Sequence, residues 1–288
     1  NRKGDWPQMR VFAFDHRMQL EEMTDRIGAP RERIGDFKVL CLEAALDVAK
    51  GRPGYGILCD SRLGRDALFH AAGSGLWIGR PVELPGSRPL KLEAELGPDF
   101  GSLIEWPLEH VVKVLCFYHP DDDAEMKERQ EDVVQRLFAS ARRNRLEMLL
   151  EVIPSKVGPV DDQTTTAVIE RFYEIGVYPD WWKLEPMTSE TAWANACETI
   201  TRNDPYCRGI VLLGLDAPAE ELEKSFEVAA GFDLVKGFAV GRTIFAEAAR
   251  RWLKGEMSNE EAVATMATNY RSLCESWDRA RARTGRAA

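Results

Sequence analysis

Eight short apolar runs recur along this chain of 288 residues, and amphipathic helical stretches separate most of them. Most of the runs are apolar at consecutive positions rather than at every second one. Parallel strands covered by helices show this pattern, because both of their faces are buried. The eight predicted strands are Arg10–Phe14, Gly56–Cys59, Leu76–Leu84, His110–Tyr118, Glu147–Ile153, Trp181–Glu185, Gly209–Leu213 and Lys236–Val240.

The alternation of strands and helices predicts an α/β fold. An open, doubly wound sheet would satisfy the alternation as well. The count of eight strands favours a closed barrel, and no glycine-rich dinucleotide fingerprint follows any of them. We therefore expect a single-domain (β/α)8 TIM barrel over residues 1–288.

The helical pattern is clearest over Ala124–Asn144, where apolar side chains share one face, aspartates precede the first turn and arginines follow the last. Ser258 and Glu261 predict a capping box that opens a C-terminal extra helix at about 258–281. The stretch Pro85–Glu109 is rich in Gly and Pro, and we expect a long excursion with one helix near the barrel mouth. Further helices are expected at 163–175, 189–203, 218–230 and 243–253.

Composition narrows the class of protein. The chain is 44% hydrophobic and 30% charged, which is typical of a soluble globular domain, and its net charge of −9 does not resemble a nucleic-acid-binding surface. No apolar run approaches the ~18 residues of a membrane span, and no signal peptide is visible. The six cysteines form no C-x-x-C pair. We expect a cytoplasmic protein without nucleic-acid or membrane partners, excised from a longer chain because it begins at Asn1.

Metal-ligand spacings are missing from the sequence. The four histidines form no H-x-x-x-H or similar pair. This disfavours a zinc site, and we expect neither a metal nor another cofactor. An oxygen-ligand site for Mg²⁺ stays open as an alternative.

Two lysines and a glutamate interrupt three of the apolar runs: Lys113, Glu151 and Lys183. Such side chains are seldom buried without a partner or a task. A lysine in an apolar site beside another cation loses its proton more readily and becomes a nucleophile, and a nearby carboxylate can move protons. The three residues therefore predict an imine-forming (Schiff-base) enzyme. The alternative is that the lysines lie at strand ends in solvent or form structural ion pairs.

Active sites of this fold lie at the C-terminal ends of the strands. We predict Asp15 as an acid that orients Lys113 or a substrate hydroxyl. The alternatives are a helix or loop cap and an ion pair with Arg17. Asp60 is a candidate for the site or a helix cap. The further candidates for binding substrate or phosphate are Arg17, Arg62, Glu185 and Gly214.

A Gly-Arg pair follows the last predicted strand and opens a helix. Gly241 would expose backbone N–H groups at the helix N-terminus, and Arg242 would add a fork of donors. The pair predicts a phosphate cradle. An ordinary turn with a solvated arginine is the alternative.

Five motifs in order resemble the tagatose-1,6-bisphosphate aldolase family, a class I aldolase barrel. They are Ala13-Phe14-Asp15-His16-Arg17, Lys113-Val114-Leu115-Cys116-Phe117-Tyr118, Leu150-Glu151, Lys183-Leu184-Glu185 and Gly241-Arg242. The chain departs from the family in two places. Leu213-Gly214-Leu215 replaces a small polar Ser-Ala-Gly, and His16 replaces a glutamine.

The chain also resembles the barrel domain, of unknown function, that is fused behind 5-dehydro-2-deoxygluconokinase in bacterial myo-inositol catabolism. The resemblance implies a metal-independent aldolase that cleaves 2-deoxy-5-keto-D-gluconate 6-phosphate into dihydroxyacetone phosphate and malonate semialdehyde. Lys183 would form the imine, Glu151 would transfer protons, and Lys113 and Asp15 would assist. The implied partners are this phosphorylated keto-sugar acid and a fused or associated sugar kinase; a homo-oligomer is left open.

Other functions stay open at this point. The barrel could bind a sugar phosphate without catalysis and regulate or scaffold the kinase, or it could cleave another ketose phosphate. A metal-dependent isomerase or epimerase is a third class. The formation of an imine on a lysine distinguishes the aldolase from the rest.

Overall fold

The computed structural model describes residues 6–285, in which eight parallel strands form a closed barrel in chain order. The prediction of a (β/α)8 TIM barrel is confirmed. The strands are β1 Met9–Ala13, β2 Tyr55–Leu58, β3 Trp77–Pro81, β4 His110–Cys116, β5 Glu147–Val152, β6 Trp181–Leu184, β7 Gly209–Leu213 and β8 Val235–Val240.

Helices follow the strands, and those after β4 agree with the predicted spans to within a few residues. The predicted strand Leu76–Leu84 is too long, because the chain leaves the sheet after Pro81 and Glu83 forms an antiparallel bridge with Leu92. The excursion after it contains two 3₁₀ helices, Ala94–Leu96 and Pro98–Glu105, instead of one helix. The α-helices are α1 Met18–Ile27, α2 Arg33–Ala49, α3 Arg65–Ala71, α4 Ala124–Arg143, α5 Thr164–Glu174, α6 Glu190–Asn203, α7 Ala219–Ala229, α8 Arg242–Leu253 and α9 Asn259–Arg283.

Two compact units make up the described chain. The first comprises residues 82–213 and 228–236, and it contains β4 to β7 with α4 to α6. The second comprises residues 6–81, 214–227 and 237–285, and it contains β1 to β3, most of β8, and α1 to α3, α8 and α9. None of the helices within residues 6–285 is long and apolar enough to cross a membrane.

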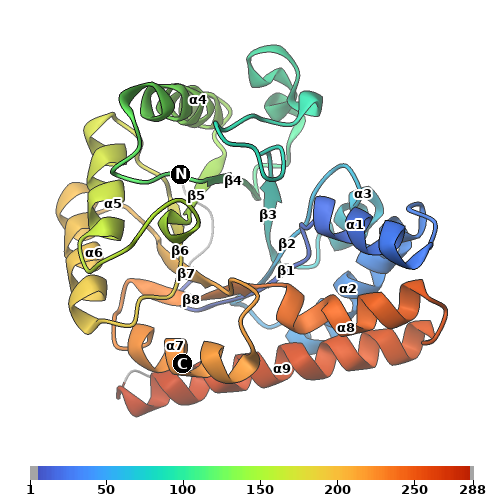
Figure 1. Ribbon diagram of the computed structural model, residues 1–288. Helices are drawn as coiled ribbons and strands as arrows, with labels where there is room; N and C mark the ends of the chain where they lie inside the picture. The colour runs from blue at the N-terminus through green and yellow to red at the C-terminus, as the bar shows by residue number, and fades with distance from the viewer. Residues whose placement is uncertain (1–5, 286–288) are drawn as a thin grey trace. The chain divides into compact units, whose positions relative to one another are not determined.

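The core of the first unit lies between its strands and its helices, with α5 packed against α6 (Figure 1). Trp182 of β6 points toward α5, where its indole N–H donates a hydrogen bond of 3.1 Å to the hydroxyl of Tyr173. Asp123 caps α4 by accepting the backbone N–H of Met126 at 2.8 Å. This orientation of Trp182 fixes which side chains of β6 face away from the helices, since successive residues alternate.

The core of the second unit depends on α9, which packs along α2 and α8 (Figure 1). Its predicted capping box is present: the Ser258 hydroxyl accepts the Glu261 N–H at 3.2 Å, and the Glu261 carboxylate accepts the Ser258 N–H at 2.8 Å. The hydroxyl of Tyr270 donates to the carbonyl of Arg10 at 2.6 Å. The last helix is thereby bonded to the first strand.

Candidate active site

Lys113, Glu151 and Lys183 lie on three neighbouring strands and share one face of the sheet. In the parallel register, Glu151 of β5 is opposite Lys183 of β6 and Leu115 of β4. Lys113 lies two residues before Leu115 and therefore faces the same way. Because Trp182 points toward α5, its neighbour Lys183 points away from that helix.

The carboxylate of Glu151 lies between the two lysine ammonium groups. Its Oε1 is 2.9 Å from Lys183 Nζ, and its Oε2 is 2.8 Å from Lys113 Nζ. Only 3% of Lys113, 4% of Glu151 and 6% of Lys183 is exposed. Interactions between charges are strengthened at such depth, and the desolvation of each charge is costly. The site is therefore a buried, charged arrangement rather than a set of solvated strand ends.

Glu83 joins this row, and the sequence analysis did not single it out. Its Oε1 accepts a hydrogen bond of 2.9 Å from Lys113 Nζ, and its Oε2 accepts the backbone N–H of Leu115 at 3.1 Å. A signal was present, because Glu83 is the one acidic residue of the predicted strand Leu76–Leu84. We name Glu83, Lys113, Glu151 and Lys183 the charged row; its charges alternate in sign.

The charged row keeps Glu151 ionised. Burial opposes its charge, but the neighbouring ammonium groups of Lys113 and Lys183 outweigh burial and hold the pKa of Glu151 below its ordinary value. Its Oε2 faces Lys113 without making an aligned hydrogen bond to any of residues 6–285. Glu151 is therefore an ionised carboxylate within hydrogen-bonding distance of both lysine ammonium groups.

Glu151→Gln should lower stability in a pH-dependent way. A carboxyl whose pKa is depressed on folding contributes stability above its unfolded pKa of about 4.3, and this contribution is lost as pH falls through the folded value. We expect the variant to be roughly 3–5 kcal/mol less stable than the parent at pH 7, because the charges of Lys113 and Lys183 would lose the carboxylate between them. The deficit should shrink below about pH 4. Thermal unfolding of both proteins at pH 7 and pH 3.5 measures it, and an equal deficit at both values would contradict the assignment.

Glu185, predicted to bind substrate, anchors the loop after β5. Its Oε1 accepts the backbone N–H of Ser155 at 3.0 Å, and its Oε2 accepts the Ser155 hydroxyl. His119 holds the same loop, since its Nε2 lies 2.8 Å from the carbonyl of Pro159. These contacts fix the loop beside the charged row, which gives Glu185 a structural role; substrate binding by Glu185 stays a prediction.

Asp60 of the second unit forms a buried ion pair with Lys38 of α2, a partner that the sequence did not reveal. Its other carboxylate oxygen accepts the backbone N–H of Leu63 at 2.7 Å. The alternative of a helix cap is wrong, because Gly64 occupies the N-cap position of α3 and makes no side-chain cap. Asp60 therefore orders the turn between β2 and α3.

The other acidic and basic candidates of the second unit surround the ends of β1 and β2. Asp15 is buried, with a carboxylate oxygen 3.9 Å from Nδ1 of His16, and Arg17 is buried at the start of α1. Arg62 is more exposed and donates two hydrogen bonds of 3.0 Å to Glu21. The predicted roles of these residues in binding or orientation stay predictions.

The Gly-Arg pair lies where β8 gives way to α8. A side chain at Gly241 would place its Cβ 2.1 Å from the carbonyl oxygen of Ala13, so only glycine fits this close approach. Arg242 is half-exposed, and its guanidinium lies 3.0 Å from the carboxylate of Asp216. Gly214 follows β7, where a Cβ would approach Val240 at 3.2 Å. Arg242 therefore pairs with an aspartate in this structure, and the phosphate cradle stays a prediction.

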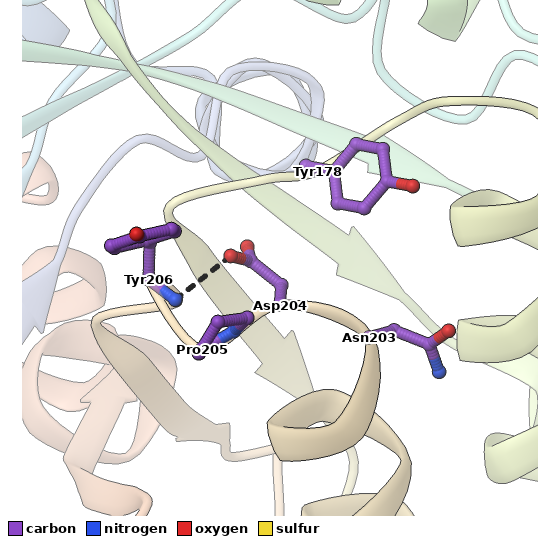
Figure 2. Close-up of a pocket in the computed structure, with 5 residues that line it drawn as sticks. All are labelled: Tyr178, Asn203, Asp204, Pro205 and Tyr206. Atoms are coloured by element: carbon purple, nitrogen blue, oxygen red, sulfur yellow. Dashed lines mark hydrogen bonds between the residues drawn. The ribbon is translucent and has the colours of Figure 1, made fainter.

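A surface pocket of about 450 Å³ lies elsewhere in the first unit (Figure 2). It is lined by Tyr178 and by residues 203–206, and the Tyr206 N–H donates a hydrogen bond of 2.9 Å to Asp204. Tyr178 precedes β6, and residues 203–206 precede β7, so the pocket lies at the N-terminal ends of these strands. Active sites of this fold lie at the C-terminal ends. None of the predicted site residues lines this pocket. Within residues 6–285, no three His, Cys, Asp or Glu side chains gather as a metal site.

The family model for uncharacterized proteins conserved in bacteria (DUF2090) matches residues 1–281. The chain belongs to this family. A comparison with curated proteins gives no match.

Among solved structures, the fold is similar to that of fructose-bisphosphate aldolase from Plasmodium falciparum, which was crystallised in a ternary complex with TRAP and a small-molecule inhibitor. The TM-score is 0.66 at 13% identity, over 98% of this chain and 93% of that chain. A likeness at this identity shows the fold alone.

Proposed function

We propose that the protein is a class I aldolase in which Lys183 forms an imine with a ketose phosphate. The observation that supports this most is the position of Glu151, whose carboxylate separates the Lys113 and Lys183 ammonium groups at 2.8 and 2.9 Å. A nucleophilic amine needs a base to take its proton, and Glu151 is within reach. Lys113 keeps that base ionised.

The reaction would begin when Lys183 transfers a proton to Glu151 and its free amine attacks the substrate ketone. Glu151 returns this proton to the carbinolamine hydroxyl, which leaves as water, and the resulting protonated imine can accept the electrons of the bond that breaks. Glu151, again ionised, removes the proton of the hydroxyl two carbons from the imine. The aldehyde leaves, Glu151 returns the proton to the enamine carbon, and hydrolysis restores Lys183.

The substrate that we propose to test first is 2-deoxy-5-keto-D-gluconate 6-phosphate. The resemblance to the barrel fused behind 5-dehydro-2-deoxygluconokinase supports it, and we propose that Arg242 binds the phosphate. With the imine at C5, removal of the C3 hydroxyl proton breaks the C3–C4 bond. The products are malonate semialdehyde and dihydroxyacetone phosphate.

Borohydride reduction tests the proposal directly. An imine on Lys183 is reduced to a stable secondary amine, so the intact mass rises by the mass of the bound ketose fragment. Peptide mapping then locates the adduct. An adduct on residues 181–185 supports the aldolase. Turnover without an adduct, abolished by EDTA, favours a metal-dependent enzyme; binding of the phosphate without turnover favours a non-catalytic barrel whose lysines only form ion pairs.

Arg242→Ala should mainly raise KM for the phosphorylated substrate. Charge-assisted hydrogen bonds are each worth on the order of 1.5–3 kcal/mol, so the loss of one should raise KM about 10- to 100-fold. If the phosphate contact also orients the ketone, kcat falls as well. Steady-state kinetics measure both. Arg250→Ala, at the other end of α8 and paired with Glu247, is the control. Unchanged kinetics for Arg242→Ala would place the phosphate elsewhere.

A further inference from the structure

Glu83 binds β4 through both oxygens of its carboxylate. One oxygen accepts from the ammonium of Lys113, and the other accepts the backbone N–H of Leu115, two residues further along the strand. The side chain is buried, with 4% of the residue exposed. A single carboxylate therefore fixes the end of a lysine side chain relative to the backbone of its own strand.

The backbone around Glu83 is held on both sides. The Val82 N–H donates to the carbonyl of Lys113 at 3.0 Å, and the Leu84 N–H donates to the carbonyl of Lys91 at 2.8 Å. Glu83 itself forms the antiparallel bridge with Leu92. With its backbone fixed in this way, Glu83 has only its side-chain torsions left to move, and its two hydrogen bonds restrain those.

We propose that Glu83 is a positioning residue that confines Lys113 to one oxygen of Glu151 and thereby leaves the other oxygen to Lys183; this inference rests on the proposed function. An ammonium on a flexible four-carbon stem can bridge both oxygens of a carboxylate. Glu83 restrains Lys113 by accepting a hydrogen bond of 2.9 Å from its Nζ, and the same Nζ lies 2.8 Å from Oε2 of Glu151. Oε1 stays within 2.9 Å of Lys183 Nζ.

The loss of this restraint has a defined effect on the reaction. In Glu83→Gln the side chain keeps its shape and can still accept the Leu115 N–H, but it loses the charge that attracts Lys113. Lys113 would then move toward Glu151 and compete with Lys183 for the base. A misplacement of about 1 Å in a catalytic group can cost on the order of 100-fold in rate. We expect kcat to fall by about that factor with KM within about threefold of the parent, because phosphate binding is untouched.

The experiment compares the parent with Glu83→Gln, Glu83→Asp and Glu147→Gln, using kcat, KM and the rate at which borohydride traps the adduct. Glu147 is a partly buried carboxylate on β5 that binds Arg208 and Trp181, so its neutral variant controls for the loss of a paired carboxylate charge on a barrel strand. Glu83→Asp keeps the charge on a shorter side chain and should recover part of kcat. Glu147→Gln should keep the parent value.

Each outcome decides the inference. Slow trapping and low kcat in Glu83→Gln, with partial recovery in Glu83→Asp, support it. If borohydride traps the parent, and Glu83→Gln keeps the parent's kcat and trapping rate, the inference is overturned but the proposed function is not. An equal fall of kcat in Glu147→Gln also overturns the inference, because it would indicate a general structural effect. A parent that borohydride cannot trap overturns the proposed function and the inference with it.

Discussion

Lys183→Met should lower the rate of aldol cleavage by at least about 1,000-fold. The substitution removes the amine that converts the substrate ketone into a protonated imine, and without the imine the electrons of the breaking bond have no acceptor. The fold should persist. Methionine fills a similar volume, and Glu151 retains Lys113 at 2.8 Å, so no buried carboxylate loses its last ammonium. Initial rates of product formation measure the loss, and circular dichroism checks the fold.

The adduct formed under borohydride provides the decisive control for this variant. It should be missing from Lys183→Met while the purified protein melts close to the parent. Lys254→Met, an exposed lysine after α8, is the matched substitution and should retain full activity. If Lys183→Met kept most of its activity, another amine would be the nucleophile, and Lys113 would be the first to test.

Lys113→Met should lower stability by as much as Glu151→Gln. It removes the ammonium between Glu83 and Glu151, and the charged row would then hold two buried carboxylates and one lysine. Breaking a buried ion pair from one side costs roughly 3–5 kcal/mol, which corresponds to a fall in Tm of about 5–15 °C for a chain of this size. Lys254→Met should stay within about 0.5 kcal/mol of the parent.

The pH dependence of Lys113→Met tests the cause of this loss. Glu83 loses the ammonium of Lys113, so burial favours the uncharged form of the Glu83 carboxyl group in the folded variant, whereas Glu151 keeps Lys183 at 2.9 Å. Protonation at low pH then stabilises the folded state, and ionisation at high pH destabilises it. We expect the gap in Tm between variant and parent to widen from pH 5 to pH 8. A gap that is constant over this range would indicate a packing defect instead.

Most of the barrel could be predicted from the sequence because both faces of its strands are buried. Consecutive apolar residues of β4 to β7 predicted strands whose bounds agree with the structure to within two residues. The end of β3 was wrong, since Val82 and Leu84 continue the apolar pattern although the Leu84 N–H bonds the carbonyl of Lys91, which lies outside the barrel strands. No bounds were predicted for helices α1, α2 and α3.

Within the site, residue types could be predicted but their partners could not. Lys113, Glu151 and Lys183 were conspicuous as lone charges in apolar runs. The contact between Lys113 and Glu83 spans 30 residues, and that between Lys38 and Asp60 spans 22. The periodicity of a helix or a strand does not bring residues this far apart in the sequence together. Only the folded structure reveals that Glu83 belongs to the charged row and that Asp60 has Lys38 as its partner.

The hydrogen bond from Tyr270 to Arg10 joins two segments that the ribosome makes at very different times. It joins residues 260 positions apart, and the Trp277 indole bonds Gln8 across 269 positions. At about 5–20 residues per second, a ribosome needs roughly 13–50 s between making β1 and making its α9 partner. During that interval the apolar strand β1 lacks the helix that covers it, so the nascent chain should be a substrate for chaperones until its last helix emerges.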